Sequence, residues 1–571
     1  MDIIRVDMAA KKITVGELPS EYKGWGGRGL TSLMINREVE AGCDPLGPEN
    51  KLIIAPGSLS GTSLVNTSRV SIGAKSPLTG GIKESNAGGT TGAVLGRLGI
   101  ACIVIENQSS DGLYILRIDQ DGTPELIPAN DYKGVRTYSL VQSLLDIYGE
   151  KNSILCIGPA GEFGLASASI QATDVDGRPC RAAGRGGLGA VMGSKGIKAV
   201  VIDHSGSAKV AITNPQDFKD AGKEFAKAIQ NLPFTGKMLP ALGTAGLVGP
   251  VNSMGAFPNM NATQGTMTDW EKISGETLAK LITERKGKTT HLGCSQCIIR
   301  CSNEFVDKKG KYVTSSLEYE TIWAMGGMTG ITDLDIIAKL DRLCDDIGVD
   351  TMNTGVAIGV AMDAGHTDYG NSQAAIDMVE QIDQGTELGK ILGNGPDHMG
   401  KHLNHQRVPT VKGQSIAAYD PRGMQGNAVT YATSPMGADH TAGNLVGLYL
   451  NGVLDPLQTE GQVEASRNAQ ITMVLFDWTG MCLLAGAALN VPEGKKAFLK
   501  TINARFGTDF SFDDIMARCI QVLKEELEFN RKAGLTSEDD RLPDFFYSEP
   551  LPPHNKVVLI KGKEMDKIFD F

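Results

Sequence analysis

The chain has 571 residues, a formal net charge of −11 and a pI of about 5.4. This length predicts several domains, and hydrophobic and charged fractions of 41% and 21% exclude a disordered, collagen-like or coiled-coil protein. The acidic balance without any Lys/Arg-rich run excludes the basic footprint of a nucleic-acid-binding protein.

The N-terminal residues, MDIIRVDMAAKK, lack a basic segment followed by an apolar one, so no secretory signal is predicted. The most apolar window, 471–491, contains Asp477, so no membrane span is expected. We therefore expect a cytoplasmic protein, and a reducing compartment disfavours disulfides among its ten cysteines. Any cysteine cluster would then be metal-binding or catalytic.

Short apolar runs between glycine-rich loops predict a β-rich first domain, residues 1–210. The expected strands are 52–55, 100–106, 114–118, 153–157 and 198–203. No repeat of fixed period is visible along the chain.

Two glycine-rich loops of this domain, 24–29 and 184–189, match G-x-G-x-x-G. A dinucleotide-binding loop follows a buried strand and opens a helix. Here GRPCRAA precedes the second copy, and Gly193 and Gly196 are expected to interrupt any helix after it, so NAD and FAD are disfavoured. Glycine N–H groups and nearby arginines would suit a phosphate-bearing ligand, and tight turns between strands are the alternative.

After residue 210 the apolar positions follow a helical period. The expected helices are 214–231, 333–346, 351–364, 371–394, 461–488, 497–506 and 511–532, while 396–428 is expected to be a loop. We predict an α+β protein with two mainly helical domains, 211–410 and 411–571, on the β-rich base.

Three cysteines in GCSQCIIRC, Cys294, Cys297 and Cys301, have the spacing C-x2-C-x3-C. A [4Fe–4S] cluster needs four thiolates, and the fourth is often distant in sequence. Cys482 is the best candidate for that ligand. The alternative is a zinc site with His291 as the fourth ligand, although no second cysteine pair is present.

A short motif, D-x-x-G followed by an apolar residue and then Asp or Cys, occurs twice. The copies are DDIGVD at 345–350 and DWTGMC at 477–482, and each follows a helical stretch. The glycine would turn the chain, and the leading aspartate could accept hydrogen bonds from ring and amino N–H groups of a ligand. Taken alone, D-x-x-G is a common helix stop.

Together these segments resemble the tungsten-containing aldehyde ferredoxin oxidoreductases over essentially the whole chain. The shared stretches are GGRGLTS (26–32), SRVSIGAKSPLTGG (68–81), NAGG (86–89), RAAGRGGLGAVMGSK (181–195), CSQCIIRC (294–301), EYET (318–321), DDIGVD (345–350), DPRGM (420–424), YATSPMGADH (431–440) and DWTGMC (477–482).

The resemblance implies a β-rich base domain with two helical domains, one tungsten held by two pyranopterins, a Mg²⁺ ion joining the pterin phosphates, and a [4Fe–4S] cluster. No side chain would bind the tungsten, so molybdenum is not excluded. By motif match, the phosphates and the magnesium would be held by Arg69, Asn86, Gly88, Arg181 and Ala182. The pterin rings would be held by Asp345, Asp350 and Asp477, and the cluster by Cys294, Cys297, Cys301 and Cys482.

Glu320 and His440 match the acidic and imidazole groups near the metal in this family. Glu320 sits in the apolar run EYETIWAMGG, where burial would raise its pKa and let it move protons near neutral pH. The alternatives are a surface glutamate at a helix start and a structural histidine.

The resemblance implies oxidation of an aldehyde to a carboxylic acid, with electrons passing to ferredoxin or a separate iron–sulfur subunit. The alternatives are reduction of another substrate, such as an aromatic acyl-CoA thioester, and an electron-transfer subunit that lacks the pterin. A homodimer is left open, because no E-x-x-H segment is present to hold the intersubunit metal of some relatives.

Overall fold

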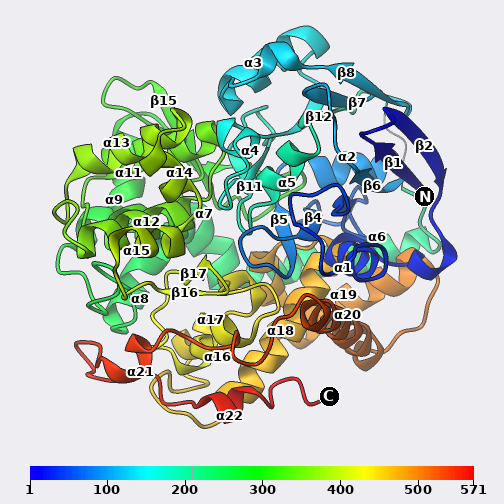
Figure 1. The fold of residues 1–571 in the computed structure, drawn as a ribbon. Coiled ribbons are helices and arrows are strands. Elements are labelled where there is room, and N and C mark those ends of the chain that lie inside the picture. The colour runs from blue at the N-terminus through cyan, green and yellow to red at the C-terminus, as the bar shows by residue number, and fades with distance from the viewer. Residues whose placement is uncertain (207–209) are drawn as a thin grey trace.

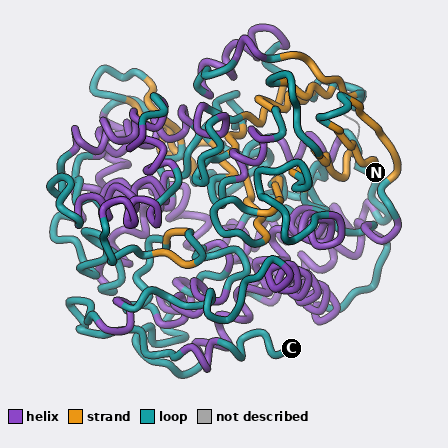
Figure 2. Tube along the Cα trace, viewed as in Figure 1, coloured by secondary structure: helices purple, strands orange, loops and turns teal. Residues whose placement is uncertain are grey.

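The computed structural model describes residues 1–206 and 210–571. Most strands gather in the N-terminal third, drawn blue to cyan in Figure 1, and the rest of the chain is mainly helices and loops (Figure 2). It also holds two small sheets, one of β13 Lys288–His291, β14 Ser302–Val306 and β15 Tyr312–Ser315, and one of β16 Thr410–Val411 and β17 Gln414–Ser415. The predicted α+β class, with a β-rich base and helical regions packed on it, is confirmed.

The N-terminal third holds two six-stranded sheets. The first sheet has the order β2-β1-β6-β3-β4-β5, and the second has the order β11-β10-β9-β12-β7-β8. Their strands are β1 Asp2–Asp7, β2 Lys12–Glu17, β3 Leu52–Pro56, β4 Val70–Lys75, β5 Ile82–Ala87, β6 Ile100–Glu106, β7 Tyr114–Ile118, β8 Pro124–Pro128, β9 Asn152–Cys156, β10 Ile170–Ala172, β11 Arg181–Ala183 and β12 Ile197–Asp203.

The two sheets have the same topology, a structural duplication that no sequence repeat of fixed period revealed. In each sheet one pair is parallel, β1 with β6 or β7 with β12, and the other neighbours are antiparallel. The sequence carries faint traces of the duplication, EYKG at 21–24 against DYKG at 131–134 and GAV at 92–94 against 189–191. The two GAV segments lie in equivalent helices, α2 (Thr91–Arg97) and α5 (Leu188–Ser194). Helix α5 includes Gly193, so that glycine does not prevent a helix.

Most predicted helices form within a few residues of their expected bounds. The longer helices are α1 Gly27–Glu38, α3 Thr137–Tyr148, α6 Pro215–Asn231, α9 Gly275–Glu284, α11 Leu334–Ile347, α12 Thr351–Asp363, α13 Ser372–Asp383, α14 Glu387–Gly393, α15 Pro396–Leu403, α16 Gln425–Thr433, α18 Gln462–Thr479, α19 Pro492–Phe506 and α20 Phe512–Lys532.

Three helix predictions need correction. The segment 461–488 is not one helix, because α18 ends at Thr479 and Gly480 turns the chain by 120° before the short 3-10 helix η8 (Leu483–Asn490). The segment 371–394 is two helices, because Gly385 adopts a left-handed φ of 62° between them. The segment 396–428 is not all loop, because it contains α15 and the start of α16. Pro396 occupies the first turn of α15, where a proline's missing N–H costs nothing.

Helical regions share two large apolar cores. One combines buried side chains from 245–449 with others from 542–568, and the second joins α6, α18, α19 and α20. The division at residue 410 stays a prediction.

Within the described ranges, no single helix is both long and apolar enough to cross a membrane. Helix α18 passes such a test only together with the following short helix η8 (Leu483–Asn490), across a 120° bend.

Candidate functional site

Each D-x-x-G motif ends a helix through its glycine. Gly348 closes α11 and Gly480 closes α18, with left-handed φ values of 79° and 77°. A side chain is strained in this conformation, so glycine is the favoured residue at both turns. The expected helix-end turns are therefore present, and they carry Asp345 and Asp477 on the last turn of each helix.

The two motif loops pack on equivalent places of the duplicated domain. A Cβ on Gly57 would lie 2.2 Å from the Gly480 backbone, and one on Gly158 would lie 2.2 Å from the carbonyl oxygen of Ile347. Backbone hydrogen bonds fix the contacts: the Arg69 N–H donates to the Gly480 oxygen (3.2 Å), and the Ser169 N–H donates to the Gly348 oxygen (2.9 Å). Each half of the first domain thus positions one copy of the motif.

The fourth cysteine lies beside the cysteine loop, and Asn66 links them. The Asn66 Nδ2 group donates to the Cys297 sulfur (3.2 Å), and the Cys482 N–H donates to the Asn66 oxygen (2.8 Å). Burial, together with the neighbouring Cys294 and Cys482 thiols, raises the pKa of the Cys297 thiol to about 11. Burial also raises the pKa of Cys301, to which Cys482 and Cys297 contribute. All four sulfurs are therefore in one neighbourhood.

The zinc alternative finds no support in this geometry. His291 is occupied, with Nε2 2.8 Å from an Asp176 carboxylate oxygen and Nδ1 3.2 Å from the Ser302 hydroxyl. Zinc–sulfur bonds of about 2.3 Å would place tetrahedral sulfurs roughly 3.8 Å apart. In the part of the chain that the structure describes, Asp174, Asp176 and His291 form the one set of three metal-ligand atoms within 4.8 Å, so the cysteine sulfurs are spread more widely than around zinc.

The loop predicted to hold phosphates abuts the cysteine loop. A Cβ on Gly88 would lie 2.6 Å from the Cys294 sulfur, and the Ser295 N–H donates to the Gly89 oxygen (3.0 Å). The Arg181 guanidinium lies against Gly293, where a Cβ would be 1.6 Å from Nη2.

The remaining phosphate-site candidates lie beside these groups. The Arg69 Nε group donates to the Asn86 side-chain oxygen, and Ala182 lies next to Arg181 in β11. The structure thus places Gly88 and Arg181 against the cysteine loop, with Arg69 near Gly88, Asn86 on Arg69, and Ala182 following Arg181.

The three motif aspartates are all buried. Burial raises the pKa of Asp345, with Asp341 adding to the shift, and burial raises that of Asp477, with Glu84 adding. Burial also raises the pKa of Asp350, although Arg185 and the N–H groups of α12 oppose it. Buried carboxyls need donors, and the ring N–H groups of a pterin would supply them.

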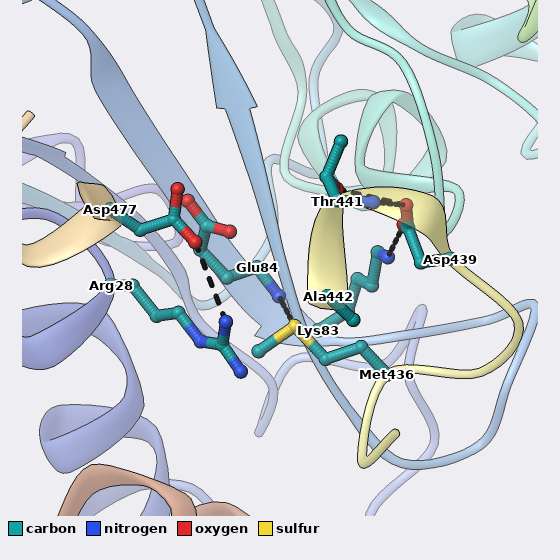
Figure 3. A pocket seen from close by; sticks show the side chains of 8 residues that line it. All are labelled: Arg28, Lys83, Glu84, Met436, Asp439, Thr441, Ala442 and Asp477. Atoms are coloured by element: carbon teal, nitrogen blue, oxygen red, sulfur yellow. Dashed lines mark hydrogen bonds and ion pairs between the residues drawn. The ribbon is translucent and has the colours of Figure 1, made fainter. Parts of the chain in front are cut away.

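A small charged cavity lies next to Asp477. Figure 3 shows the carboxylates of Asp477 and Glu84 side by side, with Arg28 reaching Asp477 from α1 (Nη1 to Oδ2, 3.4 Å) and Lys83 paired with Asp439 (3.0 Å). The cavity is lined by Arg28, Lys83, Glu84, Met436, Asp439, Thr441, Ala442 and Asp477. Sequence reasoning missed Glu84, because a single carboxylate in a strand carries no motif.

Arg28 holds three parts of the chain together. Its Nε and Nη2 groups form a bidentate pair with Glu526 of α20, each at 2.8 Å, and both side chains are fully buried. Its remaining nitrogen faces Asp477, so α1, α18 and α20 meet at one guanidinium.

Replacing Arg28 with methionine is expected to lower the free energy of unfolding by about 3–5 kcal/mol, because Glu526 would stay buried without its partner. The first transition in guanidinium denaturation, followed by circular dichroism, measures this. Arg37→Met is the matched control, since Arg37 joins the same two helices through an exposed contact to Glu525 (3.6 Å). The control should cost about 0–1 kcal/mol, and equal losses in both variants would contradict the assigned role of Arg28.

Glu320 and His440, which are far apart in sequence, face each other. The His440 Nε2 atom lies 3.5 Å from the Glu320 Oε1 atom, while the Ala418 N–H donates to Oε2 (2.9 Å). The rings of Tyr319, Tyr419 and His440 contact one another in series in tilted arrangements, at centroid distances of 5.5 and 6.3 Å. The Glu320 Oε1, His440 Nδ1 and Tyr431 hydroxyl are buried without hydrogen-bond partners. Burial raises the pKa of Glu320, and His440 partly opposes the shift.

The residues present fit a large polar cofactor. Buried polar atoms without partners include Arg181 Nε beside the cysteine loop and Glu84 Oε1 beside Asp477, and these flank the two motif loops. Such atoms are costly unless a bound group satisfies them. Four sulfurs with wide spacing likewise fit a multi-iron cluster.

Comparison with known proteins agrees with this geometry. Residues 3–204 match the family model "Aldehyde ferredoxin oxidoreductase, N-terminal domain", and residues 220–570 match "Aldehyde ferredoxin oxidoreductase, domains 2 & 3". The tungsten-containing aldehyde ferredoxin oxidoreductase of Pyrococcus furiosus is 34% identical over 98% of this chain and 94% of its own. The aliphatic sulfonate oxidoreductase, WOR-like subunit, of the same organism is 27% identical over 77% of this chain and 74% of its own.

Among solved structures, the active site complex BamBC of benzoyl coenzyme A reductase, with bound 1,5-dienoyl-CoA, superposes with a TM-score of 0.81. The superposed region covers 99% of this chain and 92% of the solved chain, at 17% sequence identity. At that identity the likeness shows the fold alone. The two family models and the full-length Pyrococcus relative go further: the chain belongs to the aldehyde ferredoxin oxidoreductase family and is an oxidoreductase of its tungsten–pterin type.

Proposed function

We propose that the chain oxidises an aldehyde to a carboxylic acid at a tungsten or molybdenum bis-pyranopterin, and passes the electrons through a [4Fe–4S] cluster. The observation that carries the proposal is the buried Glu320–His440 pair, in which each side chain keeps one polar atom without a partner. A proton acceptor beside a hydrogen-bond donor is the arrangement that hydration of a carbonyl requires.

The predicted cofactor residues divide into three groups. Asp345, Asp350 and Asp477 would hold the pterin rings. The phosphates and Mg²⁺ would be held by the residues near the cysteine loop: Arg69, Asn86, Gly88, Arg181 and Ala182. The four cysteines would hold the cluster. When bound, the metal–pterin group and the cluster supply the two-electron chemistry and its one-electron exit.

The roles of the pair follow from their contacts. Because the Ala418 N–H fixes Oε2 of Glu320, the other carboxylate oxygen is free to accept a proton from a water molecule. The His440 imidazole would donate a hydrogen bond to the carbonyl oxygen of the aldehyde and polarise it. The tyrosine rings beside them form an apolar wall that keeps bulk water away and strengthens these interactions.

The electron acceptor would be ferredoxin or a separate iron–sulfur subunit. The family name supports ferredoxin. The relative named as a WOR-like subunit supports a partner chain.

The activity is tested on anaerobically purified protein with a panel of aldehydes and a viologen dye as acceptor. The proposal predicts dye reduction and formation of the matching carboxylate. Oxidation of the reduced dye by an aromatic acyl-CoA thioester, with no dye reduction by any of the aldehydes, would favour the alternative reaction on the same scaffold. An absence of pterin would reduce the chain to an electron-transfer subunit.

A further inference from the structure

We propose that Glu84 is a further binding residue for the pterin ring at Asp477, and accepts a hydrogen bond from an N–H donor on the polar edge of that ring. The ligand class is a fused pyrimidine with amino and ring N–H groups. This inference rests on the proposed function, because it assumes that a pterin occupies this side of the site.

Glu84 projects from the sheet on the same face as a residue already placed in the site. It lies two positions before Asn86 in β5, and side chains two apart in a strand share a face. Across the sheet, Glu84 pairs with Gly73 of β4 and Asn86 pairs with Ser71, whose hydroxyl accepts from the Asn86 amide (3.3 Å). Because Gly73 has no side chain, no residue of β4 covers Glu84 from the directly opposite position. The Glu84 carboxyl and the Asn86 amide therefore lie in one row along β5.

The second motif loop brings Asp477 to this row. Figure 3 shows the Asp477 and Glu84 carboxylates next to each other at one end of the cavity, although they come from α18 and β5. Both residues are less than a tenth exposed. Two neighbouring carboxyl groups offer several hydrogen-bond acceptors close together. A ligand with two or more N–H donors along one edge would match them.

The cations nearby are already committed. Arg28 uses two of its nitrogen atoms on Glu526 and a third on Asp477, and Lys83 donates to Asp439 (3.0 Å). Glu84 Oε1 is left buried with no hydrogen-bond partner among the described residues. A buried carboxylate oxygen of this kind carries its full desolvation cost until a donor reaches it, and the cavity lies directly at Glu84 and Asp477.

The test compares cofactor content rather than turnover. Glu84→Leu, Glu84→Gln and wild-type protein are purified anaerobically, and tungsten or molybdenum, oxidised pterin fluorescence and iron are measured per chain. Losing one hydrogen bond should lower pterin retention by up to about tenfold in E84L, while iron stays at the wild-type level. E84Q keeps one acceptor oxygen and should retain an intermediate amount.

Iron content reports whether the protein has folded around its cysteines. Glu125→Leu, at an exposed strand position in the same domain, is the control for introducing leucine, and it should match wild type throughout. Wild-type pterin content in E84L with normal iron would overturn the inference. If E84L also loses iron, E84Q decides: faster pterin loss than wild type on dialysis supports the inference, and equal loss overturns it. Wild-type protein without pterin would instead overturn the proposed function.

Discussion

Cys482→Ala is expected to abolish the complete [4Fe–4S] form of the iron–sulfur cluster. The Cys482 N–H donates to the backbone oxygen of Asn66, and the Asn66 side chain donates to the Cys297 sulfur. Cys482 therefore lies where it would supply the fourth thiolate beside the cysteine loop. A [4Fe–4S] cluster with only three thiolates is incompletely held. Iron per chain should fall from about four to about three or fewer, and the low-temperature electron paramagnetic resonance signal of the reduced [4Fe–4S] cluster should disappear.

The matched control is Cys519→Ala. Cys519 is fully buried in the apolar core against which Cys482 packs, but it sits in α20, outside both the cysteine loop and the D-x-x-G motif. This variant should keep wild-type iron. Equal iron loss in both variants would show that removal of any core thiol damages the protein, and retention of the complete cluster in C482A would remove Cys482 from the ligand set.

Glu320→Gln is expected to lower turnover by about 100-fold to 10,000-fold, the range that a positioned proton acceptor contributes. Glutamine keeps the size of the side chain and can still accept from the Ala418 N–H, so metal, pterin and iron contents should stay at wild-type levels. Steady-state dye reduction with the best aldehyde, normalised to metal content, measures the effect.

The pH profile gives a second readout for Glu320. Burial raises the pKa of this carboxyl, and a proton acceptor must be ionised to act. Wild-type turnover should therefore fall as the pH is lowered through a pKa above the usual value of about 4.3, and E320Q should lack this acidic limb. Glu276→Gln, an exposed glutamate in the first turn of α9 as Glu320 is in α10, should change neither rate nor profile. An unchanged rate in E320Q with full metal content would contradict the role of Glu320.

Local chemistry made much of the fold predictable. The strand 100–106 and the helix ends at Gly348 and Gly480 follow from apolar runs and from turns that favour glycine. Spacing alone singled out the Cys294 loop, and the repeated D-x-x-G pattern singled out Asp345 and Asp477.

Contacts between distant segments were not predictable in this way. The duplicated sheets share only short identical segments, because a strand tolerates many apolar sequences. The Arg28–Glu526 pair joins positions near opposite ends of the chain. Glu84 becomes a candidate binding residue only because the fold places it beside Asp477. The close approach of Gly57 to Gly480 likewise depends on docking of α18 against the first sheet, which no periodicity encodes.

Metal analysis of the anaerobically purified chain tests most directly whether the three sulfurs of the cysteine loop and that of the distant Cys482 gather iron beside a metal–pterin. The account predicts about four iron atoms together with tungsten or molybdenum near one atom per chain, and no stoichiometric zinc. Zinc in place of iron, or iron with neither tungsten nor molybdenum and no pterin, would contradict it.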